Sequence, residues 1–167
     1  MNKILTWEVL KREVDRLRGE GKKIAFTNGC FDILHVGHVR YLREARRTGD
    51  CLVLALNSDA SVRAIKGEKR PLVPEGERAE VVAALDCVDY VTFFAETTPL
   101  RLIEFLRPDV LAKGADWPEE AVVGRDAVLS WGGRVVLCPL IEGVSTTNIV
   151  ARVLQVYGSG AKIETPA

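Results

Sequence analysis

The chain has 167 residues, of which 47% are hydrophobic and 28% are charged, which is the balance of a folded globular protein and not of a disordered one. Lysine plus arginine and aspartate plus glutamate each number 23, so the overall charge gives no support to a nucleic-acid-binding or membrane-surface protein. No apolar stretch approaches the length of a membrane span, and the first 20 residues lack the pattern of a secretion signal, so we expect a cytoplasmic protein.

Short apolar runs rich in β-branched residues alternate with longer stretches of helical period along the chain. A first helix is predicted at residues 6–18, where apolar residues recur on one face. Strands are predicted at residues 23–27, 51–56, 90–93, 110–112 and 134–137. Further helices are predicted at residues 36–47, 77–85, 99–106, 119–131 and 147–156, and residues 158–167 are predicted to form a frayed tail.

This βα alternation predicts one α/β domain over residues 1–167, a doubly wound, Rossmann-like parallel sheet of about five strands with helices on both faces. Such sheets bind ligands beyond the carboxyl ends of their strands, so the residues that follow strands are the candidates for function. The four cysteines are widely spread and form no CxxC pair, and reduced thiols are the simpler interpretation.

The segment after the first predicted strand carries the strongest functional signal. Residues 27–32 read Thr-Asn-Gly-Cys-Phe-Asp, and the next helix opens with His35-Val36-Gly37-His38. A glycine-containing loop followed by a helix N-terminus with free N–H groups suits an anionic ligand. A spacing of three residues puts both histidines near one side of the first helical turn, and Gly37 leaves room for close approach. We interpret this segment as a triphosphate site.

The two histidines also allow other interpretations. Zinc would need more ligands, and Cys30 is the only nearby candidate in the sequence. Two purely structural histidines are a stronger alternative, although these are the only histidines in the chain and both fall where a doubly wound sheet binds its ligand. The fingerprints GxxxxGK[ST] and GxGxxG are absent, which argues against P-loop kinases and ordinary dinucleotide-binding dehydrogenases.

Residues 27–38 resemble the HxGH nucleotidyltransferases of the cytidylyltransferase-like superfamily. Other matching segments occur in the family order at residues 57–59, 66–67, 70–71, 78, 113–117 and 143–147, so the resemblance covers about residues 22–153. Within that superfamily the chain most resembles the adenylyltransferases that make ADP-heptose from D-glycero-β-D-manno-heptose 1-phosphate. Those enzymes occur alone or as the second half of a fused kinase and adenylyltransferase.

The resemblance implies a role for each matching residue. Three residues, His35, His38 and Lys66, would stabilise charge on the reacting phosphates as catalytic residues, while Arg70 and Arg78 would contact the substrate phosphate. The nucleotide-binding residues that it implies are Thr27, Asn28, Gly29, Cys30, Phe31, Gly37, Lys113, Gly114, Asp116, Ser145, Thr146 and Thr147.

Several residues keep more than one interpretation. Asp32 either orients a histidine, contacts a metal ion through water, or is a structural turn residue. Asp116 equally fits a contact with a ribose or sugar hydroxyl and a helical cap, and Trp117 is either a stacking surface or a cover for the core. One hydroxyl suffices to cap a helix, so the three at residues 145–147 favour binding of the β and γ phosphates. Glycerol-phosphate cytidylyltransferases carry an arginine where this chain has Leu140, which favours ATP over CTP.

The implied reaction is in-line attack by the phosphate of a sugar 1-phosphate on the α-phosphorus of ATP, giving an ADP-sugar and pyrophosphate. Mg²⁺ is the expected cofactor, held by substrate phosphates and water without a cage of protein side chains. The expected partners are a second copy of the chain and a separate sugar kinase in a lipopolysaccharide pathway, with no nucleic acid or membrane. The alternatives are a cytidylyltransferase or coenzyme adenylyltransferase of the same superfamily and, from another class, a non-catalytic nucleotide-binding regulatory module.

Overall fold

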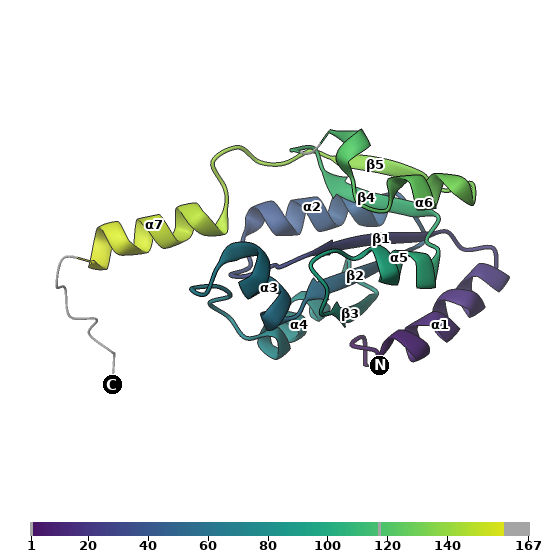
Figure 1. Ribbon diagram of the computed structural model, residues 1–167, viewed down its shortest axis with the longest axis horizontal. Coiled ribbons are helices and arrows are strands. Elements are labelled where there is room, and N and C mark those ends of the chain that lie inside the picture. Colours follow the sequence, from purple (N-terminus) through teal and green to yellow (C-terminus); the bar gives the residue numbers. More distant parts are fainter. Residues whose placement is uncertain (1, 117, 159–167) are drawn as a thin grey trace.

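The computed structural model describes residues 2–116 and 118–158, and it contains a five-stranded sheet with strand order β3-β2-β1-β4-β5. The strands are β1 (Ile24–Gly29), β2 (Cys51–Asn57), β3 (Tyr90–Phe94), β4 (Val110–Gly114) and β5 (Arg134–Cys138), and every neighbouring pair is parallel. The predicted fold class is therefore confirmed (Figure 1). Trp117 and the expected frayed tail after Gly158 lie outside the described residues.

The helices follow the strands along the chain, with some differences from the prediction. They are α1 (Trp7–Gly19), α2 (Val36–Arg47), α3 (Asp59–Lys66), α4 (Glu75–Ala83), α5 (Leu100–Leu106), the 3₁₀ helix η1 (Glu119–Ala121), α6 (Arg125–Ser130) and α7 (Thr146–Tyr157). Helix α3 was not predicted, although Ser58 caps it by accepting a hydrogen bond from the Ser61 N–H. The single helix predicted at residues 119–131 is wrong, because Gly124 takes a φ of +91° between η1 and α6.

Alternation of side chains along the strands produces two cores. Leu52, Leu54 and Leu56 of β2 point to one face of the sheet and pack with buried residues of α2 and α4. Val53 and Ala55 point to the opposite face and pack with α1, α5 and α6. Both faces of the sheet are thus covered, which leaves its edges and strand ends as the places where a ligand can bind.

The strand order places a topological switch beside β1. The chain runs outward from β1 through β2 to β3 and then crosses back to β4, which pairs with β1 on its other side. The loops after β1 and β4 therefore leave the sheet toward opposite faces, and the crevice between them is the expected ligand site of a doubly wound sheet.

Helix α7 begins at this end of the sheet and projects away from the body of the protein (Figure 1). Its last turns are exposed, and they include the apolar residues Val153, Leu154, Val156 and Tyr157. None of the helices within residues 2–116 and 118–158 combines the length and the apolar character needed to cross a membrane.

Candidate active site

A cavity of about 560 Å³ lies at the carboxyl edge of the sheet. Its walls come from the segments that follow all five strands, from the first turn of α2 and from the start of α7. Sixteen of the eighteen residues assigned to the site from the sequence line it, Asp32 among them, and the two that do not are Thr27 and Arg78. The position of the cavity follows from the parallel sheet, because parallel strands end at a common edge.

The two histidines form a stacked pair at the start of α2. His35 is the N-cap of the helix, and its Nδ1 accepts a hydrogen bond from the His38 N–H at 3.4 Å. The rings stack with centroids 3.7 Å apart and planes at 18°, and the centroid of the Phe31 ring lies 4.9 Å from that of His38. A Cβ on Gly37 would lie 3.0 Å from the His35 ring, so only glycine leaves that ring in place.

Burial keeps both imidazoles neutral near pH 7. Burial lowers the pKa of His35, and burial together with the neighbouring His35 lowers the pKa of His38 to about 4, against a smaller opposing effect of Asp32. Because Nδ1 of neutral His35 accepts a hydrogen bond, its proton sits on Nε2. The pair therefore supplies N–H donors, and positive charge for a triphosphate must come from other side chains.

Three cationic side chains line the cavity. Lys66 ends α3 and is exposed, and Arg70 lies in the loop of residues 67–74, which we call the arginine loop. Lys113 at the end of β4 donates a hydrogen bond to Asn28 Oδ1. Burial lowers the pKa of Lys113 to about 8 although nearby Asp116 favours its charged form, so it remains mostly cationic at neutral pH.

The start of α7 presents hydroxyls and free N–H groups to the same cavity. Ser145 is its N-cap and accepts from the Asn148 N–H at 3.1 Å, and Thr147, the second residue of the helix, also lines the cavity. Thr146 is buried, and its hydroxyl donates to the Asp32 carbonyl oxygen at 2.6 Å. The N-termini of α2 and α7 thus both border one cavity, and each carries partial positive charge suited to phosphate.

The contacts of Asp32 differ from those expected for the metal-contacting role that the sequence left open. It is 1% exposed, and its carboxylate accepts from Arg70 Nε at 2.6 Å and from the N–H groups of Leu72 and Val73, both at 2.9 Å. Burial alone would raise its pKa, but these hydrogen bonds outweigh burial and hold the pKa below its usual range. Asp32 is therefore the structural anchor of the arginine loop.

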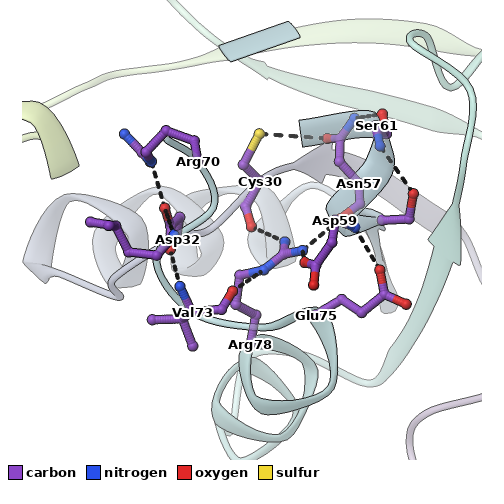
Figure 2. A network of polar contacts seen from close by, with 11 residues as sticks. Cys30, Asp32, Asn57, Asp59, Ser61, Arg70, Val73, Glu75 and Arg78 are labelled. Atoms are coloured by element: carbon purple, nitrogen blue, oxygen red, sulfur yellow. Dashed lines mark hydrogen bonds and ion pairs between the residues drawn. The ribbon is translucent and has the colours of Figure 1, made fainter. Parts of the chain in front are cut away.

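Two other assignments need correction. Thr27 is fully buried on β1 and its hydroxyl is hydrogen-bonded to the Tyr41 hydroxyl, so its side chain faces the core and not the cavity. Arg78 was assigned to the substrate phosphate, but it is 2% exposed and binds backbone carbonyls and Asp59 beneath the site (Figure 2). A buried arginine and a phosphate-binding arginine are indistinguishable in sequence, which explains the error.

Sequence reasoning left several cavity residues out of the site. They are Tyr41, Asn57, Ile65, Thr97, Leu140, Ile141 and Val144. Asn57 and Thr97 could have been found, since they stand at or shortly after the carboxyl ends of β2 and β3. Ile65 gave no such signal because α3, which carries it, was not predicted.

The site offers little to a metal ion by itself. Among the described residues, no group of three or more histidine, cysteine, aspartate or glutamate side chains is arranged to hold a metal. Its donor set is mainly cationic and hydroxylic, which suits phosphate oxygens better than Mg²⁺.

Comparison with known proteins yields consistent matches. Residues 26–152 match the cytidylyltransferase-like family. Two proteins named bifunctional protein HldE are similar to this chain over 156 residues each. The one from Geobacter metallireducens is 59% identical to it and the one from Pelobacter propionicus is 58% identical. Each alignment covers 93% of this chain and 32% of the relative. The chain thus spans about a third of the length of these relatives. The crystal structure of a lipopolysaccharide core biosynthesis protein from Thermoplasma volcanium superposes with a TM-score of 0.61 at 27% identity, covering 72% of this chain and 98% of that one.

Proposed function

The chain belongs to the cytidylyltransferase-like family of nucleotidyltransferases, and we propose that it transfers AMP from ATP to a heptose 1-phosphate, giving ADP-heptose and pyrophosphate. The observation that carries the proposal is the stacked, neutral His35–His38 pair, which borders the same cavity as the hydroxyls at the start of α7. Two sets of uncharged donors and two helix N-termini face one space, an arrangement suited to a triphosphate that reacts at its α-phosphorus.

We assign the β4, β5 and α7 side of the cavity to the nucleotide. Ser145 and Thr147 would bind the β and γ phosphates with the N–H groups of α7, and Lys113 would add charge. Gly114 lets the side chains of Asp116 and Leu140 approach the backbone closely, since a Cβ there would lie 2.6 Å from Asp116 Oδ1 and 3.1 Å from Leu140. The exposed Leu140 gives this end an apolar surface for the base.

We assign the β2 and β3 side to the sugar phosphate. Arg70 donates its Nε to Asp32, which aims its two remaining nitrogens as a planar fork suited to bidentate contact with a phosphate. Lys66 stands beside it as a flexible point charge, and Asn57 and Thr97 supply polar groups for sugar hydroxyls. The acceptor phosphate then lies opposite the leaving pyrophosphate, as in-line displacement requires.

The reaction needs no covalent intermediate with the protein. An oxygen of the sugar phosphate, already ionised at neutral pH, attacks the α-phosphorus, and the bond to the bridging oxygen of the β-phosphate breaks. The N–H donors of His35 and His38 stabilise negative charge on the α-phosphoryl oxygens and on the leaving pyrophosphate. Mg·ATP is the substrate form, and the enzyme contributes alignment and hydrogen bonds.

The choice of heptose rests on relatives and is the finer part of the proposal. The HldE proteins that the chain matches are bifunctional and about three times its length, so their whole activity is not transferred to it. The similarity to a lipopolysaccharide core biosynthesis protein supports an activated sugar for a surface glycan. A kinase reaction must make the sugar phosphate, whichever chain carries it.

The homodimer also stays a prediction, for which light scattering of the purified protein is the test.

Pyrophosphate release tests the proposal. ATP or CTP with Mg²⁺ is paired with heptose 1-phosphate, glycerol 3-phosphate and other phosphorylated acceptors. We expect rapid release only with ATP and heptose 1-phosphate. Release with another pair would replace the substrates and favour a cytidylyltransferase or a coenzyme adenylyltransferase, and silence with every pair despite nucleotide binding would favour a regulatory module.

A further inference from the structure

The buried guanidinium of Arg78 forms four hydrogen bonds with surrounding oxygen atoms (Figure 2). Its Nε donates to the Val73 carbonyl oxygen at 3.0 Å, and its Nη1 donates to the Cys30 carbonyl oxygen at 2.5 Å. Its Nη2 donates to the Asn57 carbonyl oxygen at 2.9 Å and to Asp59 Oδ1 at 2.8 Å. One buried side chain on α4 therefore joins the loop after β1, the end of β2, the start of α3 and the arginine loop.

Two of these partners are themselves cavity residues. Cys30 and Asn57 line the cavity, and the Cys30 thiol points at Asn57 Oδ1 at 3.9 Å. The Asn57 side chain donates to Ser61 Oγ at 2.9 Å, and that hydroxyl donates to the Glu96 carbonyl oxygen at 2.7 Å, next to cavity residue Thr97. Displacing the Asn57 backbone would thus disturb the wall of the cavity as far as the loop after β3.

The arginine loop is held from two directions. The Val73 N–H donates to Asp32 and the Val73 carbonyl oxygen accepts from Arg78, so this residue is fixed at both backbone groups. Arg70, three residues earlier, is fixed through its Nε by the same Asp32. The orientation of the Arg70 fork therefore depends on a frame to which Arg78 contributes.

The partners of Arg78 lie outside the elements that build the proposed nucleotide side. They belong to residues 30–73, whereas the proposed nucleotide side is built from β4, β5 and α7. We propose that Arg78 is a positioning residue that shapes the sugar-phosphate side of the cavity through Asn57 and the arginine loop, without touching substrate. This inference rests on the proposed division of the cavity between the two substrates. Lysine could not replace Arg78, because a compact ammonium lacks the planar fork that reaches four acceptors.

The test compares Arg78→Lys with a matched control, Val82→Ala. Val82 is a fully buried residue on the same helix, and its apolar side chain packs in the core and forms no hydrogen bonds. Both variants should melt at a lower temperature than the wild type. Arg78→Lys should also raise the KM of the acceptor about tenfold and leave the KM of ATP within twofold, whereas Val82→Ala should leave both KM values within twofold.

Several results would overturn the inference. Equal rises in both KM values, the same acceptor effect in Val82→Ala, or an unchanged melting temperature in Arg78→Lys would each do so. If Arg78→Lys does not fold, Asp59→Ala removes one of the four contacts and should shift the acceptor KM in the same direction by a smaller factor. The assay uses whichever acceptor gives pyrophosphate release, so a wrong sugar changes the proposed function and leaves this test intact.

Hydrogen exchange gives a readout that needs no turnover. In Arg78→Lys the backbone amides of residues 57–74 should exchange faster, while those of residues 143–149 at the nucleotide side should keep their wild-type rates. Equal acceleration in both segments, or none in either, would contradict the one-sided role of Arg78.

Discussion

Replacing His38 by glutamine should remove a specific pH dependence of stability. In the folded protein burial and the neighbouring His35 lower the pKa of His38 to about 4, whereas the unfolded chain has the ordinary value of about 6.5. The unfolded state therefore binds more protons than the folded state between these two pH values. The free energy of unfolding consequently decreases as the pH falls from about 6.5 toward 4. The stabilisation is fully present above about pH 6.5.

The size of the effect follows from the two pKa values. A difference of one in pKa corresponds to about 1.4 kcal/mol, so the wild type should lose about 1.4 kcal/mol through this group by pH 5.5 and about 2.5 kcal/mol by pH 4.5. Glutamine does not titrate, so His38→Gln should lack this loss. Other groups titrate in both proteins, and the contributions of those that do not interact with His38 cancel in the difference.

Urea denaturation at pH 7.5, 5.5 and 4.5 measures the free energy of unfolding of both proteins. The stability difference between wild type and variant should shift in favour of the variant by the amounts given above as the pH falls. A difference that stays constant within about 0.5 kcal/mol would show that His38 is protonated as easily in the folded state as in the unfolded state. The proposal that it acts as a neutral donor would then be refuted.

Further predictions follow from the same geometry. His38→Ala should lower turnover by roughly 10²- to 10³-fold, the cost of losing one such donor, and activity within a few-fold of wild type would contradict its role. Gly37→Ala should displace the His35 ring, only 3.0 Å from the new methyl, and reduce turnover at least about tenfold with little change in melting temperature; an unchanged turnover would argue against a requirement for that ring position. Asp32→Asn should cost roughly 3 kcal/mol at pH 7 and flatten the acid limb of the stability curve, because the low pKa of Asp32 stabilises the fold above about pH 4 and this contribution is lost as the pH falls through the folded-state value; equal acid limbs in urea titrations would count against it. Activity should rise with Mg²⁺ until the ion matches total ATP, because the described residues form no metal cage; saturation at the protein concentration instead would indicate a protein-bound ion.

The sequence predicted the candidate site best where chemically distinctive side chains follow the carboxyl end of a strand. His35 and His38 lie at the start of the helix that follows the first strand and its loop, so the rule that ligands bind at the carboxyl ends of strands pointed to them. The same rule, applied further, would have found Asn57 and Thr97. Gly124 shows a local limit, because its positive φ divides a stretch whose periodicity looked like one helix.

The sequence did not reveal contacts between residues that are distant in the chain. Arg78 bonds to the Cys30 carbonyl oxygen 48 residues away, and Thr146 bonds to the Asp32 carbonyl oxygen 114 residues away. Every residue has a backbone carbonyl oxygen, so no pattern of side chains in the sequence predicts which of them will accept such a hydrogen bond. The polar network under the cavity therefore became visible only in three dimensions.

The most direct test of the central claim is ³¹P NMR of the purified protein with Mg·ATP and heptose 1-phosphate carrying ¹⁸O in its phosphate. Attack on the α-phosphorus predicts a new diphosphate diester with ¹⁸O at the sugar phosphorus and in the bridge, together with unlabelled pyrophosphate. Labelled pyrophosphate, or ATP and sugar phosphate that remain unchanged while nucleotide binding is intact, would contradict the account.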